Sequence, residues 1–198
     1  MTPSGTLDFQ PGDALLVVDV QRDFLPGGAL GVRGGDAVVP ALNRYLAAAR
    51  SHGAPVVATR DWHPAGHCSF AARGGPWPPH CVAGTTGAAF SPDLALPQDA
   101  VIVSKATGPD EEAYSAFAGT GLAQRLRDRG VRRVLVGGLA TDYCVLHTVR
   151  DARAAGFEAV VLEDAVRAVE LAAGDGERAL AAMKAAGALA ARYEDFAA

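Results

Sequence analysis

Short, nearly uninterrupted apolar runs alternate along the chain with longer segments in which apolar residues recur every three to four positions. Uninterrupted apolar runs are typical of strands that are buried on both faces, as in a parallel sheet covered by helices. The runs that we interpret as strands are Ala14–Asp19, Pro55–Arg60, Ala100–Ser104, Arg133–Gly137 and Ala159–Leu162, with Ala188–Arg192 as a sixth candidate.

The amphipathic segments between these runs end in a common way. Each is followed directly by a glycine, which readily takes the positive φ that a helix C-terminus favours. The predicted helices are Asp36–His52, Thr120–Arg129, Thr141–Ala155 and Asp175–Ala186. This alternation predicts the α/β class, as a three-layer α/β/α, doubly wound, mostly parallel sheet of five to six strands. The length suits a single domain over residues 1–198.

Composition narrows the classes of partner. The net charge is −4 and the arginines are scattered, so we expect no nucleic-acid partner. No apolar run approaches the roughly 18 residues of a membrane span, and residues 1–10 do not resemble a signal peptide. We therefore expect a cytoplasmic protein without a membrane partner. The three cysteines are an odd number, which favours free thiols, metal ligands or a nucleophile over a disulfide framework. A homo-oligomer remains open.

Reactive side chains collect where the predicted strands end. Open α/β sheets bind ligands at the carboxyl ends of their strands. Asp19 ends the first strand, Asp61 and His63 follow the second, Lys105 follows the third, and Cys144 lies beyond the fourth. The segment 61–99 between the second and third strands is long and rich in Gly, Pro and His, which favours a functional loop.

Cys144 is the candidate nucleophile. With Thr141 as N-cap, it lies in the first turn of a helix, where unpaired N–H groups stabilise a thiolate. Asp19 would accept the thiol proton, and Lys105 would hold both anions together. The alternatives are a buried structural cysteine, a turn aspartate and a solvated lysine at a strand end.

Asp61 and His63 form a metal-type pair, because alternate residues of an extended segment point to the same side. His80 or His67 could complete a two-histidine, one-carboxylate site with open positions. The alternative is a loop Asp and His that bond to the backbone. His147 follows Cys144 by three residues, but we favour a satisfied helical histidine over a Cys–His dyad.

Five segments together resemble one known family. They are VVDVQRDF (17–24), TRDWHP (59–64), GPWPPHC (75–81), SKAT (104–107) and GLATDYC (138–144), in order within a region from about Ala14 to Val166. The chain resembles the isochorismatase-like cysteine hydrolases. The RDWHP and GPWPPHC pieces are similar to the nicotinamidase and pyrazinamidase branch of that family.

The resemblance implies a set of roles. Asp19, Lys105 and Cys144 would be the catalytic triad; Asp61, His63 and His80 would hold one divalent metal ion, with zinc expected and iron or manganese open; Phe24, Trp77 and Tyr143 would flank the substrate ring; and the N–H groups of Ala140 and Cys144 would form an oxyanion hole after a cis Leu139–Ala140 bond. The implied activity is hydrolysis of nicotinamide, and of pyrazinamide, to the acid and ammonia through a cysteine thioester, in NAD salvage.

Two other functions compete with this prediction. A cysteine hydrolase of another small amide, carbamoyl or ureido compound would share the Asp-Lys-Cys set. A binding protein with a closed zinc site built from His67, Cys68, His80 and Cys81 would not need that set.

Overall fold

A single parallel sheet organises the chain. The structure, a computed structural model, describes residues 8–196. Six strands run in the order β3-β2-β1-β4-β5-β6, and every pair of neighbours is parallel. Their bounds are β1 Asp13–Val18, β2 Val56–Asp61, β3 Val101–Lys105, β4 Arg133–Leu139, β5 Glu158–Arg167 and β6 Leu189–Ala191. The predicted fold class and the sixth strand are confirmed.

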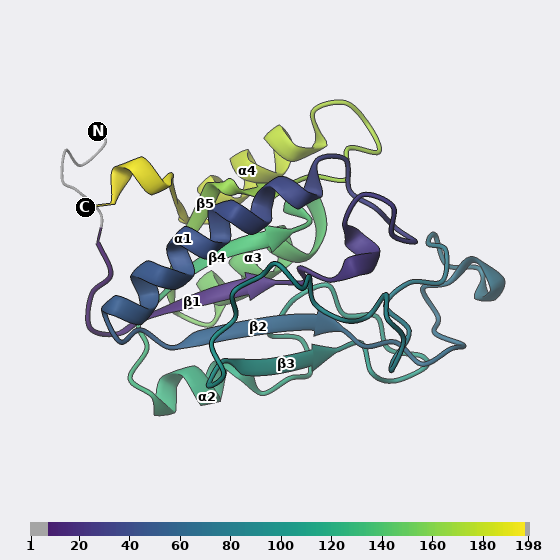
Figure 1. The fold of residues 1–198 in the computed structure, drawn as a ribbon, viewed down its shortest axis with the longest axis horizontal. Helices are drawn as coiled ribbons and strands as arrows, with labels where there is room; N and C mark the ends of the chain where they lie inside the picture. The colour runs from purple at the N-terminus through teal and green to yellow at the C-terminus, as the bar shows by residue number, and fades with distance from the viewer. Residues whose placement is uncertain (1–7, 197–198) are drawn as a thin grey trace.

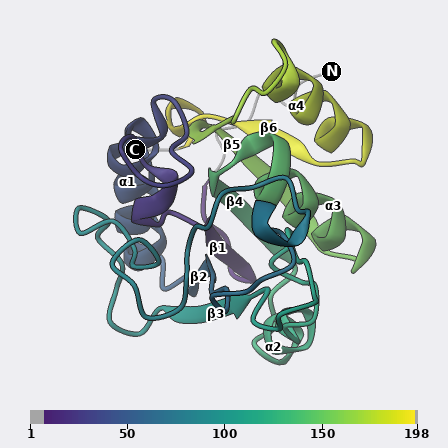
Figure 2. The same ribbon diagram turned by 90° about the vertical axis from the view of Figure 1, so that its right-hand side faces the viewer.

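Helices cover both faces of the sheet, as Figure 2 shows with α1 on one side and α2, α3 and α4 on the other. The helices are α1 Val38–Ser51, α2 Leu122–Asp128, α3 Leu146–Ala154 and α4 Asp175–Ala185. Alternate residues of β1 belong to the two cores: Leu15 and Val17 pack with α1, and Leu16 and Val18 pack with the other three helices. Burial on both faces explains why the strands read as continuous apolar runs.

The connections diverge between β1 and β4. From β1 the chain adds β2 and β3 on one side, then returns to add β4, β5 and β6 on the other. Such a reversal opens a crevice at the carboxyl ends of the two central strands. Here β4 passes very close to β1: Gly138 has a φ of +126°, and a Cβ on it would meet the Val18 carbonyl oxygen at 2.0 Å. Only glycine fits at this crossing.

The third predicted helix differs from its prediction at its start. Residues Thr141–Val145 form a π-helical turn, η4, and α3 begins only at Leu146. The turn follows Ala140, which stands at the cap position, and no side chain caps it. Thr141 is buried and is not the N-cap, so that prediction was wrong. The Ala140 carbonyl accepts from the Tyr143 and Val145 N–H groups, and this five-residue step widens the turn that carries Cys144.

The long segment between β2 and β3 begins at the carboxyl end of the sheet and then runs back to the start of β3 (Figure 1). It contains one short 3-10 helix, η3 Ala71–Arg73, and isolated bridges that pair His63 with Val82 and Phe70 with Trp77. Three further 3-10 turns are η1 Arg22–Phe24, η2 Gly35–Ala37 and η5 Tyr193–Asp195. Within residues 8–196, no helix is both long and apolar enough to cross a membrane.

Candidate active site

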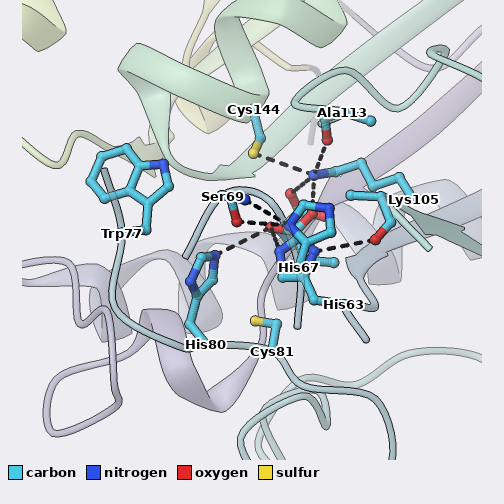
Figure 3. Close-up of polar contacts among 12 residues, drawn as sticks. His63, His67, Ser69, Trp77, His80, Cys81, Lys105, Ala113 and Cys144 are labelled. Atoms are coloured by element: carbon cyan, nitrogen blue, oxygen red, sulfur yellow. Dashed lines mark hydrogen bonds and ion pairs between the residues drawn. The ribbon is translucent and has the colours of Figure 1, made fainter. Parts of the chain in front are cut away.

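Lys105 is the centre of the charged cluster at the carboxyl edge. It is the last residue of β3, and its side chain is fully buried. Its ammonium lies 2.9 Å from the Asp19 carboxylate, forms an ion pair with Asp61, and donates to Cys144 Sγ at 3.4 Å and to the Ala113 carbonyl at 3.1 Å (Figure 3). Burial opposes the charge, but the neighbouring carboxylates of Asp19 and Asp61 outweigh it and raise the pKa of Lys105 well above its ordinary value. The cation is therefore fixed among three acidic groups.

Asp19 occupies an unusual backbone position directly after β1. Its φ is +50°, in the left-handed region that non-glycine residues rarely adopt. One carboxylate oxygen accepts from the Thr59 hydroxyl at 2.7 Å, and the other faces the Lys105 ammonium. Burial raises the pKa of Asp19 above its ordinary value although Lys105 acts in the opposite direction. A backbone outlier at such a group is typical of a functional site.

Cys144 is buried, and its sulfur lies within 4.8 Å of carboxylate oxygens of Asp19 and Asp61. Burial raises the pKa of the Cys144 thiol well above its ordinary value, and this outweighs the opposite effect of Lys105. Burial and two nearby carboxylates favour the neutral thiol, and they act against the stabilisation of a thiolate that we expect from the start of a helix. His147 is not its partner: its ring stacks on Tyr114 at 5.3 Å.

Asp61, His63 and His80 converge on one point from β2 and the long loop. Their side-chain ligand atoms all lie within 4.8 Å of one another, and the three residues are buried. One oxygen of Asp61 pairs with Lys105, and the other lies 3.5 Å from His63 Nε2 and 4.0 Å from His80 Nε2. Although burial opposes it, the charge of Lys105 lowers the pKa of Asp61 below its ordinary value. Asp61 thus joins the charged cluster to the histidine pair.

The two histidines are oriented as metal ligands are. His63 Nδ1 lies 3.2 Å from the Ala106 carbonyl, and His80 Nδ1 lies 2.8 Å from the Pro78 carbonyl. A proton on each Nδ1 satisfies these carbonyls and leaves each Nε2 with a lone pair toward Asp61. Within residues 8–196, the buried His63 Nε2 finds no hydrogen-bond partner. A divalent cation fits this donor set, because it would take two imidazole nitrogens and one carboxylate oxygen.

His67 lies outside this group of ligand atoms. Its ring stacks on His63 at 4.1 Å, its Nδ1 pairs with the Ser69 hydroxyl at 2.8 Å, and its Nε2 pairs with the Glu111 carbonyl at 3.0 Å. Both ring nitrogens are therefore occupied, and of the two candidates His80 is the one that meets Asp61 and His63. The closed site of His67, Cys68, His80 and Cys81 is not among the ligand groups that residues 8–196 form.

Gln21 holds Asp61 in place, a role that sequence reasoning missed. The chain leaves the sheet after β1, and the fully buried Gln21 side chain then bonds to both main-chain groups of Asp61. Its amide oxygen accepts from the Asp61 N–H at 2.8 Å, and its amide nitrogen donates to the Asp61 carbonyl at 2.8 Å and to the Ala88 carbonyl at 2.9 Å. The side chain thus replaces the strand neighbour that β1 no longer provides. The signal in the sequence was a polar Gln two residues after Asp19, directly beyond an apolar strand.

A small cavity lies beside Cys144, with a volume of about 360 Å³ that includes the space open at its mouth. Its lining includes the three residues expected to flank a substrate ring, Phe24, Trp77 and Tyr143, together with Asp61, His80, Ala140 and Cys144. Trp77 forms one wall, with its ring 5.1 Å from that of Tyr143 and its indole N–H donating to the Tyr114 hydroxyl at 3.1 Å. Sequence reasoning missed three lining residues, Leu30, Tyr114 and Val169, which come from loops that carry no motif.

One backbone N–H group at the cavity is open. The Leu139–Ala140 peptide bond is cis, and Ala140 lines the cavity together with Cys144. Among residues 8–196, no group accepts from the Ala140 N–H. An open N–H group beside a nucleophile can donate to a developing oxyanion.

Known proteins of one family are similar to this chain. The family model described as the isochorismatase domain matches residues 13–195. The chain belongs to the isochorismatase family. This family member is 40% identical to the nicotinamidase of Escherichia coli strain K12 over 199 residues, which cover 90% of this chain and 93% of that one.

Two solved structures extend the likeness to the whole fold. The pyrazinamidase of Pyrococcus horikoshii, in complex with zinc, is 54% identical to this isochorismatase-family chain, with a TM-score of 0.89 and 92% and 100% of the two chains covered. PnC1 from L. infantum, in complex with nicotinate, is 38% identical, with a TM-score of 0.87 and 96% and 98% covered.

Proposed function

We propose that the chain is a nicotinamidase, which hydrolyses nicotinamide to nicotinate and ammonia and acts likewise on pyrazinamide. The observation that carries this proposal is one cavity with two kinds of group on its walls. Cys144 lines the cavity from the buried cluster that it forms with Asp19 and Lys105. Asp61 and His80 line it from the group that they form with His63, and Asp61 joins the two groups. The nicotinamidase and pyrazinamidase relatives support the same activity.

Asp61, His63 and His80 would hold one divalent metal ion, and zinc is the ion we propose, because the Pyrococcus horikoshii relative was solved with zinc. When bound, the metal would supply a Lewis acid that attracts a ring nitrogen of the substrate. Phe24, Trp77 and Tyr143 would hold the aromatic ring between apolar surfaces. The carboxamide would then lie near Cys144.

The first half of the reaction is acylation of the cysteine. Burial raises the pKa of the Cys144 thiol, so a base must take its proton as sulfur attacks the amide carbon. Asp19 receives this proton, and the carbonyl electrons move onto oxygen. The N–H groups of Ala140 and Cys144 stabilise that oxyanion, each by roughly 3–4 kcal/mol in comparable sites. The C–N bond then breaks, Asp19 returns the proton to nitrogen, and ammonia leaves.

The second half is hydrolysis of the thioester. Asp19, again a carboxylate, takes a proton from water, and the water oxygen attacks the acyl carbon. The C–S bond breaks, the sulfur recovers its proton, and the acid is released. The raised pKa of Asp19, caused by burial, suits a group that must give its proton back. Lys105 keeps the ionised form of Asp19 accessible throughout.

Ammonia release from nicotinamide by purified, zinc-loaded protein tests this proposal. We expect release by the wild type, none by Cys144→Ala, and normal release by Cys68→Ala, a matched control because Cys68 lies outside the cavity. Zinc should remain bound to Cys144→Ala, since the sulfur is not one of its ligands. A well-folded, zinc-loaded wild type that leaves nicotinamide intact would exclude the proposed function, and other small amides would then be tried.

A further inference from the structure

The loop that follows β5 forms part of the cavity wall and is tied to the turn that carries Cys144. Val169 of this loop lines the cavity. The Asp142 carboxylate accepts from the Val169 N–H at 2.9 Å and from the Glu170 N–H at 3.0 Å, with one oxygen for each. Asp142 lies in η4, two residues before Cys144. The Asp142 carboxylate therefore links the turn that carries Cys144 to the loop that supplies Val169 to the cavity wall.

The rest of this loop has little apolar packing to hold it. Leu171 is 69% exposed, and Glu170 has a φ of +58°. Glu170 accepts from the N–H groups of Gly174 and Gly176 at 2.8 and 2.7 Å, and Asp175 accepts from the Ala172 N–H at 2.7 Å. These bonds tie the loop to the start of α4, away from the cavity. Val169 itself packs against the core on the α1 side of the sheet, and the bond to Asp142 holds its main chain.

Asp142 has no competing partner for its charge. Among residues 8–196, no Lys, Arg or His lies within ion-pair distance of Asp142. Both of its oxygens are thus free to serve the two loop N–H groups, and charged hydrogen bonds are stronger than neutral ones. An aspartate is the shortest side chain that accepts two adjacent main-chain N–H groups at once.

We propose that Asp142 is a positioning residue that sets the width of the ring pocket. By fixing Val169, it lets the pocket accept nicotinamide and reject pyridine carboxamides with an added ring substituent. This inference rests on the proposed function. Asp142 is not among the residues that line the cavity, and it acts through the main chain of Val169.

Steady-state kinetics of Asp142→Asn on nicotinamide and on a ring-methylated nicotinamide tests the proposal. The asparagine amide keeps one acceptor, but its NH₂ group opposes the second loop N–H. We expect KM for nicotinamide to rise about tenfold, the equivalent of one charged hydrogen bond, with a smaller change in kcat. The preference for nicotinamide over the methylated substrate should fall severalfold, because Val169 can then move away from the ring and make room for the methyl group. Asp175→Asn, which removes a similar cap from the same loop, is the matched control and should keep both KM and preference.

A second variant keeps the test decisive if Asp142→Asn folds poorly. Val169→Ala widens the same wall directly and should lower the substrate preference by itself. In the double variant the two effects should not add, since both act on one wall. Equal loss of kcat/KM on both substrates, or additive effects, would overturn the inference while the proposed function stands. A wild type inactive on nicotinamide would overturn both.

Discussion

Replacing Lys105 with Met removes the only cation within ion-pair distance of Asp19 among residues 8–196. Methionine keeps the length and apolar stem of the side chain but leaves the carboxylates of Asp19 and Asp61 facing each other. Two buried carboxylates without a cation cannot both stay ionised. We therefore expect the variant to fold with one carboxyl protonated.

The expected loss in the free energy of unfolding equals the cost of protonating that carboxyl. Protonating a carboxyl with an ordinary pKa of about 3.9 at pH 7 costs about 4 kcal/mol, at about 1.4 kcal/mol per pH unit. Breaking a buried ion pair from one side costs a similar ~3–5 kcal/mol. The substitution raises the folded-state pKa of the carboxyl, so the free energy of unfolding of the variant falls as pH rises above the unfolded-state pKa. Near pH 5 the loss should shrink to about 1.5 kcal/mol.

Denaturant unfolding of chelator-treated protein at pH 7 and pH 5 measures this difference. Lys184→Met is the matched control, because Lys184 is the other lysine of the chain and pairs with Glu163 on the surface at 2.8 Å. That exposed pair should contribute about 0–1 kcal/mol to the free energy of unfolding. Amidase activity of Lys105→Met should fall by about 10²–10³-fold, as when one charge-stabilising donor is lost.

Two results would refute this reasoning. One is a loss of unfolding free energy in Lys105→Met no larger than that in Lys184→Met. The other is a loss that stays the same between the two pH values, because it would mean that no carboxyl takes up a proton.

Three further predictions concern groups around the site and in the core. Gln21→Met keeps the volume of the side chain but breaks its bonds to Asp61, so we expect zinc affinity to fall about 10–100-fold, measured by competition with a chromophoric chelator; unchanged affinity in folded protein would argue against the role of Gln21. Trp77→Phe keeps a ring but loses the 3.1 Å bond to Tyr114, and KM should rise about threefold to tenfold with kcat nearly constant; a fall confined to kcat would contradict this. Burial and the 2.7 Å bond to the Asp164 carboxylate raise the pKa of Tyr45 above its ordinary value, so the stability that its neutral form contributes is present below pH about 10 and is lost as pH rises further. Tyr45→Phe should therefore unfold about 1–2 kcal/mol more easily at neutral pH, and its difference from the wild type should shrink at high pH; a constant difference in denaturant titrations would count against this account.

The amino-acid sequence alone was enough to predict the strands of the sheet and most of the reactive residues at its carboxyl edge. The apolar runs predicted five strands and a candidate sixth, because burial on both faces leaves a local pattern that needs no knowledge of neighbours. The glycines after the helices predicted where all four helices end to within one residue. Asp19, Asp61, Lys105 and Cys144 could be placed at one edge because the carboxyl ends of parallel strands all lie there.

Contacts between distant segments decided the rest. The sequence could not reveal that one Asp61 carboxylate is shared by Lys105 and the histidine pair, or that Gln21 stands in for a strand neighbour. It predicted a thiolate at Cys144 from helix position, whereas burial beside two carboxylates favours the thiol. Val169 lines the cavity from a loop that carries no recognisable motif, so its role could not be predicted. Charge state and cavity shape depend on which groups meet across the fold, and that is a property of the tertiary structure.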